Sequence, residues 1–222
     1  MLKKLLLTLS VALSLAGALT TQAAPPKKNP PPPPILISSL PFTITAPGTY
    51  VLTGNLSYTA SGTKPVAITI NVPTGSIGSA IILDFNGFTI TNSSINTTVY
   101  GIDIQSPNAT GASPVTIRNG KIALFYYGVY DVKVSGVNLN NLTINTSNPG
   151  ESAIRFELVA SSTIANCNIS GGNYGIEDIG SPGGNSYVND TFTNTSPIVV
   201  TGQNGGVPTV ENSCSFNGPL IN

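Results

Sequence analysis

The sequence has no histidine and no tryptophan, only two cysteines, and few charged residues. The absence of histidine excludes Ser-His-Asp and Cys-His nucleophilic catalysis, and it excludes zinc sites that depend on imidazole. Charged residues make up 8% of the chain, against about 25% in an ordinary globular protein. Because no stripe of lysine and arginine is present, the chain also lacks the electrostatic footprint of a nucleic-acid-binding protein.

Asparagine, threonine, serine and glycine take the place of the missing charges, and aliphatic residues are plentiful. The aliphatic and β-branched content is too high for a disordered chain. Such a composition favours strands with a neutral polar surface. After removal of an N-terminal signal, roughly 185 residues remain, which is the size of one domain.

The N-terminus has the three parts of a secretory signal, which we place at residues 1–24. Lys3 and Lys4 give a positive start, an apolar run follows from Leu5 to Leu19, and small residues surround a cleavage position near Ala23. The run is short for a bilayer core of about 30 Å, which disfavours the alternative of a membrane anchor. We therefore expect a protein that is secreted, periplasmic or at the cell surface, and not membrane-embedded after signal cleavage.

Residues 25–37 are predicted to be a proline-rich linker, and residues 38–222 to fold. The run from Pro30 to Pro34 favours an extended polyproline II spacer. A stiff spacer holds a folded domain away from its attachment point, although a leader with no specific role fits the composition equally well.

The folding segment repeats itself from residue 66 onward. Each repeat opens with glycine or alanine followed by an aliphatic residue. The opening pairs are Ala67-Ile68, Gly101-Ile102, Gly128-Val129, Ala153-Ile154 and Gly175-Ile176. Short segments with period-two alternation, bounded by turn residues, predict strands and not helices.

A second motif places an asparagine between two apolar residues of each repeat. These asparagines lie 22, 25, 23 and 23 residues apart, and they are Asn119, Asn141, Asn166, Asn189 and Asn212. In a β-solenoid, equivalent positions of successive coils stack about 4.8 Å apart. We expect a structural asparagine ladder at a turn, because asparagine tolerates the left-handed conformation that sharp corners require.

These patterns predict an all-β fold, a single-stranded right-handed parallel β-helix of about six coils. The alternative is an antiparallel β-sandwich, which also has many short strands. A sandwich does not explain why the same asparagine recurs in phase.

Cys167 and Cys214 fall two coils apart, which is about 10 Å and too far for an intrachain disulfide.

Three segments carry a resemblance to a known family: Leu40 to Leu52, Ile82 to Ile90 and Val115 to Gly120. They resemble bacterial right-handed β-helix repeat proteins of the pectin-lyase-like superfamily, over roughly residues 38 to 217. The resemblance implies the fold and leaves function open, because the superfamily contains pectate lyases, polygalacturonases and non-catalytic surface proteins. Its hydrolases need clustered aspartates, and its lyases need aspartate ligands for calcium and a basic proton abstractor. Neither motif maps onto this chain residue by residue.

The main candidate site is a column of outward-pointing residues that follow the opening pairs. These residues are Thr69, Asp103, Tyr130, Arg155 and Glu177, and Glu157 shares their face. In a binding site, Asp103, Tyr130, Arg155, Glu157 and Glu177 would contact the ligand, with Tyr130 stacking on a sugar ring. In a catalytic site, the candidates are Arg155, Glu177 and Asp103, with calcium held by carboxylates. The simplest interpretation is a cross-coil ion ladder without a ligand.

A second surface flanks the apolar position after each asparagine, and it presents hydroxyl and amide side chains. Its residues are Thr89, Thr91, Lys121, Ala123, Thr143, Asn145, Asn168, Ser170, Thr191, Thr193, Ser215 and Asn217. Threonine suits strands for steric reasons alone. An ice-binding face is a remote alternative, because Lys121 and Ala123 interrupt the row of threonines that it would need.

The aromatic cluster of Phe125, Tyr126 and Tyr127 with Tyr130 favours glycan stacking if it faces outward, and core packing if it faces inward.

The sequence therefore predicts a secreted or surface-displayed protein that binds carbohydrate or extracellular matrix without catalysis. The alternative is a small polysaccharide lyase or glycoside hydrolase. We expect no cofactor, except calcium if the chain is a lyase, and we assign no metal site and no nucleic-acid partner. The last coil has no obvious covering segment, which predicts either a polar closing loop or self-association through its open edge.

Overall fold

The structure is a computed structural model that describes residues 30–73, 80–94, 98–106, 114–146, 152–193, 196–201, 209–210 and 214–216. Backbone contacts divide the chain into two units, Met1–Pro31 and Pro32–Asn222, and every described strand lies in the second. The described residues contain no helix, and hence none that is long and apolar enough to span a membrane. The predicted signal lies outside the described residues.

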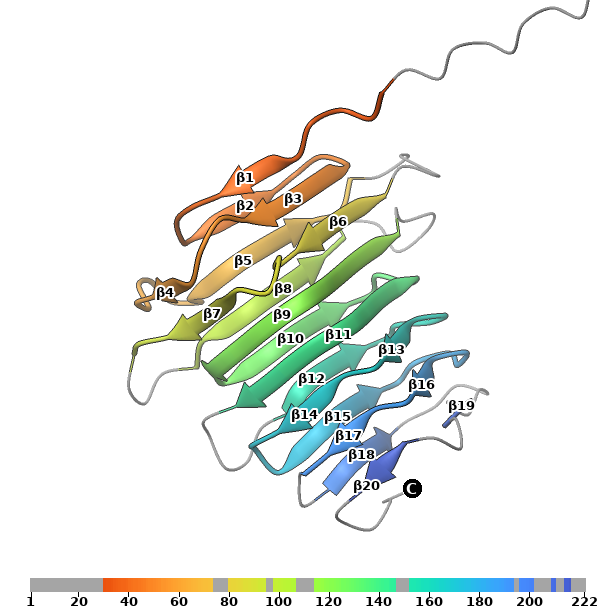
Figure 1. Cartoon of the computed structure of the whole chain (residues 1–222). Coiled ribbons are helices and arrows are strands. Elements are labelled where there is room, and N and C mark those ends of the chain that lie inside the picture. The colour runs from red at the N-terminus through yellow and green to blue at the C-terminus, as the bar shows by residue number, and fades with distance from the viewer. Residues whose placement is uncertain are drawn as a thin grey trace, which may run out of the picture. The chain divides into compact units, whose positions relative to one another are not determined.

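The larger of two sheets contains thirteen strands among the described residues, and we call it the large sheet. Figure 1 shows its strands stacked from β1 in orange to β20 in blue. They are β1 (Ile35–Ile37), β3 (Gly48–Leu52), β4 (Leu56–Tyr58), β6 (Ile81–Asp84), β7 (Thr89–Asn92), β9 (Val115–Phe125), β11 (Val137–Thr146), β13 (Thr163–Ala165), β14 (Asn168–Ser170), β16 (Ser186–Val188), β17 (Thr191–Phe192), β19 (Thr209–Val210) and β20 (Ser215–Phe216).

The second sheet, which we call the small sheet, has seven described strands in the order β18-β15-β12-β10-β8-β5-β2. They are β2 (Phe42–Ile44), β5 (Val66–Asn71), β8 (Tyr100–Gln105), β10 (Tyr127–Val132), β12 (Ser152–Glu157), β15 (Tyr174–Ile179) and β18 (Ser196–Thr201). Strand β1 begins at Ile35, before the predicted start of the folded domain, and it pairs with β3.

The chain passes alternately between the two sheets, and each strand pairs in parallel with the equivalent strand of the preceding pass. Strands from one repeat therefore lie beside strands from the next, as in a β-solenoid. This confirms the prediction of an all-β fold with stacked repeats. It also excludes the antiparallel sandwich, because the described strand pairs are parallel.

The opening pairs of the repeats lie in register along the small sheet. Their aliphatic members form one column of buried side chains: Ile68, Ile102, Val129, Ile154 and Ile176. Like side chains thus stack on like side chains in the interior, and none of them could bury its surface within a single repeat. Neither Cys167 nor Cys214 is part of a disulfide bond.

The sharp bends along the large sheet, which we call its corners, are occupied by asparagines in the left-handed conformation; Asn119 and Asn141 lie within β9 and β11. The φ angles are 52° at Asn86, 61° at Asn119, 53° at Asn141, 56° at Asn166 and 55° at Asn189. Asparagine is the residue other than glycine that adopts this conformation most readily, which explains its recurrence. Asn86 was not among the predicted positions, because a longer loop separates it from Asn119. The predicted Asn212 lies outside the described residues.

Candidate functional site

The predicted column of candidate residues lies on the outer face of the small sheet. Strand pairing places Thr69, Asp103, Tyr130, Arg155 and Glu177 directly beside one another in that order. Glu157 lies two positions further along β12. The structure therefore brings together all the candidate residues, and their contacts decide what they are able to do.

Asp103 is fully buried, although it occupies an outward-facing position of strand β8. Lys64 covers it, and Lys64 Nζ lies 2.6 Å from Asp103 Oδ2. The amide of Gln105 donates a second hydrogen bond to the same oxygen. Asp103 is thus neutralised by a lysine that lies outside the repeated motif, which the sequence pattern had no means of indicating.

Four tyrosines cluster on the same face, and their rings are close to one another. The ring centroids are 5.3 Å apart for Tyr100 and Tyr127, 5.2 Å for Tyr100 and Tyr130, and 5.0 Å for Tyr126 and Tyr127. Phe125 points inward and is fully buried. The predicted aromatic cluster therefore divides: Phe125 lies in the core, while Tyr126, Tyr127 and Tyr130 pack together on the outer face, where Tyr127 is buried.

Cations already lie over these tyrosine rings. Lys64 Nζ is 4.9 Å from the centroid of Tyr100 and 5.4 Å from that of Tyr130. The guanidinium of Arg155 is 5.7 Å from the centroid of Tyr127. Because cation–π contacts occupy these rings, they are poor platforms for stacking a sugar ring.

Arg155 is held by two carboxylates. Its Nε lies 2.7 Å from Glu157 Oε1, and its Nη1 lies 2.9 Å from Glu177 Oε2. Burial disfavours the charged form of Arg155, but the hydrogen bond with Glu157 and the charge of Glu177 outweigh it and raise the pKa. A guanidinium in this state does not act as a proton-abstracting base.

Tyr130 and Ser152 complete the set of contacts on this face. Burial raises the pKa of Tyr130 to about 12, and the charge of Glu157 and its hydrogen bond with Tyr130 act in the same direction. Ser152 Oγ donates to Glu177 Oε2 at 2.7 Å. We call this set the ion–aromatic ladder, and it comprises Lys64, Tyr100, Asp103, Gln105, Tyr127, Tyr130, Ser152, Arg155, Glu157 and Glu177. Its charged side chains form ion pairs with one another, as the simplest interpretation of the column predicts, and Asp103 Oδ1 is left without a hydrogen-bond partner.

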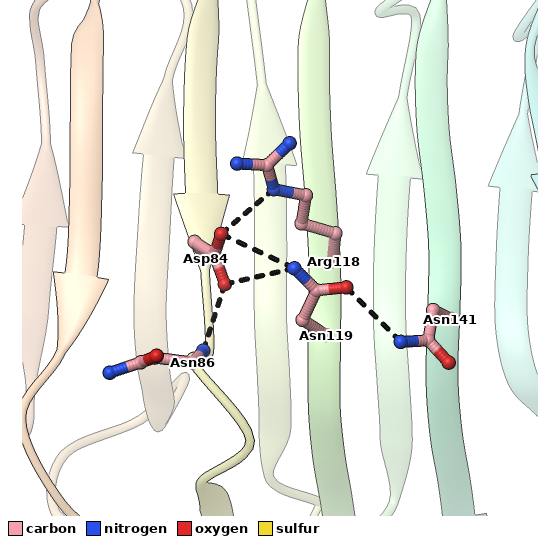
Figure 2. Close-up of polar contacts among 5 residues, drawn as sticks. All are labelled: Asp84, Asn86, Arg118, Asn119 and Asn141. Atoms are coloured by element: carbon pink, nitrogen blue, oxygen red, sulfur yellow. Dashed lines mark hydrogen bonds and ion pairs between the residues drawn. The ribbon is translucent and has the colours of Figure 1, made fainter.

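A second polar network lies at the asparagine corners and is shown in Figure 2. Asp84 accepts hydrogen bonds from the backbone N–H of Asn86 at 2.8 Å, from Arg118 Nε at 2.8 Å and from Asn119 Nδ2 at 3.2 Å. Burial alone would raise the pKa of Asp84, but these donors outweigh it and lower the pKa. Asn141 Nδ2 in turn donates to Asn119 Oδ1 at 3.1 Å.

The corner network predicts a graded response at Asn141. We expect Asn141→Ala to lower the free energy of unfolding by about 1–2 kcal/mol, because alanine loses the hydrogen bond and tolerates the left-handed conformation poorly. Asn141→Gly loses the same hydrogen bond but keeps the conformation, and we expect it to cost less. Urea denaturation of both variants measures the difference. Equal losses would mean that the conformation of this corner contributes nothing.

The outer face of the large sheet carries a groove of about 540 Å³. It is lined by Asn55, Leu56, Ser57, Thr89, Thr91, Lys121, Ala123, Leu124 and Asn145. Strand pairing places Ser57, Thr91, Ala123 and Asn145 in one column across β4, β7, β9 and β11. The methyl group of Ala123 leaves a hollow between its longer neighbours, so the surface here is not flat.

The polar side chains of the groove are open to a ligand. Toward the other described residues, the side chains of Ser57, Thr91 and Lys121 make no hydrogen bond or ion pair. Two other lining side chains are already engaged: Asn55 Oδ1 accepts from the Thr89 N–H at 2.9 Å, and Asn145 Nδ2 donates to Ser170 Oγ at 2.9 Å. The groove therefore offers unused donors and acceptors at the surface, whereas the unpartnered acceptor of the ion–aromatic ladder, Asp103 Oδ1, is buried.

The sequence indicated part of this groove. Five of its residues belong to the predicted hydroxyl and amide surface: Thr89, Thr91, Lys121, Ala123 and Asn145. Asn55, Leu56, Ser57 and Leu124 were not indicated, because β4 precedes the clear repeats and Leu124 interrupts the alternation.

Comparison of the chain with protein-family models, with curated proteins and with solved structures finds no match. Among the described residues, no three cysteine, aspartate or glutamate side chains are grouped as metal ligands would be.

Proposed function

We propose that this chain is an exported right-handed β-helix of about six coils, related to the pectin-lyase-like proteins, that binds carbohydrate without cleaving it. The binding surface is the groove on the large sheet. The proposal rests on one observation, which is that this groove is lined with side-chain donors and acceptors that have no partner among the described residues.

The composition of the groove suits a sugar. The hydroxyl groups of Ser57, Thr89 and Thr91 both donate and accept hydrogen bonds, as sugar hydroxyls do, and the Lys121 ammonium supplies three further donors. Leu56, Ala123 and Leu124 provide the apolar contact that the C–H groups of a sugar ring require. A volume of about 540 Å³ is within the range of small-molecule binding sites, which is about 300–1,000 Å³.

Polysaccharide cleavage is the second candidate function. The contacts of the predicted site residues support it less well than the groove supports binding. A lyase or hydrolase needs a base that is free to take a proton. Arg155 and Glu177 bind each other, and Asp103 lies buried under Lys64. A hollow of about 320 Å³ adjoins these residues and is lined by Lys64, Asp103 and Tyr130 among others.

A pair of nearly isosteric variants tests the groove. We expect Thr91→Val to weaken binding of the best glycan on an array about fivefold, because one hydrogen bond contributes about 1 kcal/mol. Thr143→Val is the matched control, since Thr143 lies on the same sheet but outside the groove. Array binding of the mature protein, followed by titration calorimetry of the three proteins, gives the measurement.

Two outcomes would overturn the proposed function. The first is that the wild-type protein binds no glycan on the array. The second is that Thr143→Val weakens binding as much as Thr91→Val, which would place the ligand elsewhere on the sheet. Release of unsaturated or reducing ends from the bound glycan would favour the second candidate function.

A further inference from the structure

We propose that Leu124 sets the class of glycan that the groove accepts, namely chains of pyranose rings that present an apolar C–H face. This inference rests on the proposed function and names the part of the ligand that one residue recognises. Leu124 lines the groove, and 46% of its surface is exposed to solvent. An exposed leucine beside hydroxyl groups supplies the apolar half of a sugar site.

The backbone at Leu124 is unfavourable for leucine. Its φ angle is 64°, in the left-handed region that bulky residues rarely occupy. Five corners in the described residues carry asparagine in the same conformation: Asn86, Asn119, Asn141, Asn166 and Asn189. Leucine at position 124 therefore differs from the asparagines at those corners, as Leu158 and Lys133 do elsewhere in the described residues. Replacing it with asparagine removes the apolar side chain without adding backbone strain.

Asn92 holds this strained corner in place. It is almost fully buried, and its Nδ2 donates to the Leu124 carbonyl at 3.0 Å and to the Ser94 carbonyl at 3.2 Å. Its Oδ1 accepts from the Ser94 N–H at 2.9 Å. The Leu124 backbone is thus fixed from the adjacent strand β7, which also provides Thr89 and Thr91 to the groove. The apolar side chain and the hydroxyls are consequently positioned together.

Leu158 offers a matched control within the same chain. Its φ angle is 58°, and 46% of its surface is exposed, as for Leu124. Its N–H donates to the Ile179 carbonyl at 2.9 Å, at the corner after β12, and it does not line the groove. The two leucines therefore share their strain and exposure, and they differ in their access to the proposed ligand.

The experiment compares Leu124→Asn with Leu158→Asn. We expect both variants to raise the melting temperature by about 2–4 °C, because asparagine relieves the left-handed strain. Only Leu124→Asn should weaken binding of cellohexaose, mannohexaose or xylohexaose, by about tenfold, because only that leucine meets the sugar ring. Leu124→Met keeps an apolar side chain and should restore most of the affinity. A gain in stability with a loss of binding is not expected of a purely structural residue.

The outcomes separate this inference from the proposed function. If the wild-type protein binds none of the pyranose chains and binds inulin, a furanose chain, the ligand class proposed here is wrong while carbohydrate binding stands. If the wild-type protein binds pyranose chains and Leu124→Asn binds them equally well, the role of Leu124 is wrong and the groove stands. Absence of binding to every glycan overturns both.

Discussion

Raising the pH from about 5 to about 8.5 is expected to lower the free energy of unfolding by several kcal/mol. The cause is the ionisation of carboxyl groups that the fold buries without sufficient partners. Four aspartates are fully buried among the described residues, namely Asp103, Asp131, Asp178 and Asp190. Two of them, Asp131 and Asp190, have strongly raised pKa values.

Asp131 has the higher pKa of the two. Burial raises its pKa to about 8, the hydrogen bond from the Val134 N–H opposes the rise, and the charge of Asp103 adds to it. Its Oδ1 accepts that bond at 3.2 Å, while its Oδ2 has no partner among the described residues. Burial likewise raises the pKa of Asp190 to about 7, against hydrogen bonds from Cys167 and Val188. Asp190 Oδ2 also lacks a partner in the described part of the chain.

The direction of the pH effect follows from these raised pKa values. In the unfolded chain both carboxyls have a pKa near 3.9, so the folded state binds protons more tightly than the unfolded state. The stabilising effect of protonation is complete below about pH 4, and it is lost as the pH rises through about 7 for Asp190 and about 8 for Asp131. A tenfold difference in proton affinity between the folded and unfolded states corresponds to about 1.4 kcal/mol, so the combined effect is large.

Urea denaturation at several pH values measures this effect. Asp131→Asn keeps an acceptor for Val134 and removes the charge, so we expect it to flatten the pH dependence above about pH 5. Asp84→Asn is the control, because the pKa of Asp84 is lowered and its ionisation falls below this range. A wild-type stability that is constant from about pH 5 to 8.5, or an Asp131→Asn variant with an unchanged slope, would contradict the prediction.

The repeat period made most of the fold predictable. Aliphatic residues at the opening pairs and asparagines at the corners recur because each coil needs the same buried side chain and the same left-handed turn. The stacked register of Asp103, Tyr130, Arg155 and Glu177 follows from this period alone. Period and register, however, say nothing about which groups neutralise one another.

The character of the two surfaces was not predictable for that reason. Lys64, which buries Asp103, lies in a loop without a repeated motif, and Tyr100 joins the cluster only through stacking of β8 on β10. The groove depends on a small side chain, Ala123, between longer neighbours. A hollow forms where adjacent coils differ in side-chain size, whereas a repeated sequence pattern shows only what adjacent coils have in common.

Gly120→Ala is expected to be among the most destabilising single substitutions. A β-carbon at this position would clash first with Phe85 Cβ, and it would lie 2.7 Å from Phe85 Cγ and 2.6 Å from the Phe88 carbonyl oxygen. Phe85 is fully buried, so its ring has no free space to enter. The clash arises because the corner of one coil turns its phenylalanine onto the backbone of the next. We expect a loss of about 2–4 kcal/mol in the free energy of unfolding.

Gly54→Ala is the control for loss of glycine itself, because a β-carbon there meets no atom within 4 Å. Its effect should stay within about 0.5 kcal/mol of the wild type. The pair Gly120→Ala and Phe85→Gly completes a double-mutant cycle, because glycine removes both Phe85 Cβ and Phe85 Cγ, the side-chain atoms that the new β-carbon would meet. If the clash is the cause, loss of these two atoms relieves it, and the double variant is more stable than the sum of the single losses predicts. Strict additivity would place the cost of Gly120→Ala in its contact with the Phe88 carbonyl oxygen and not in its contact with Phe85.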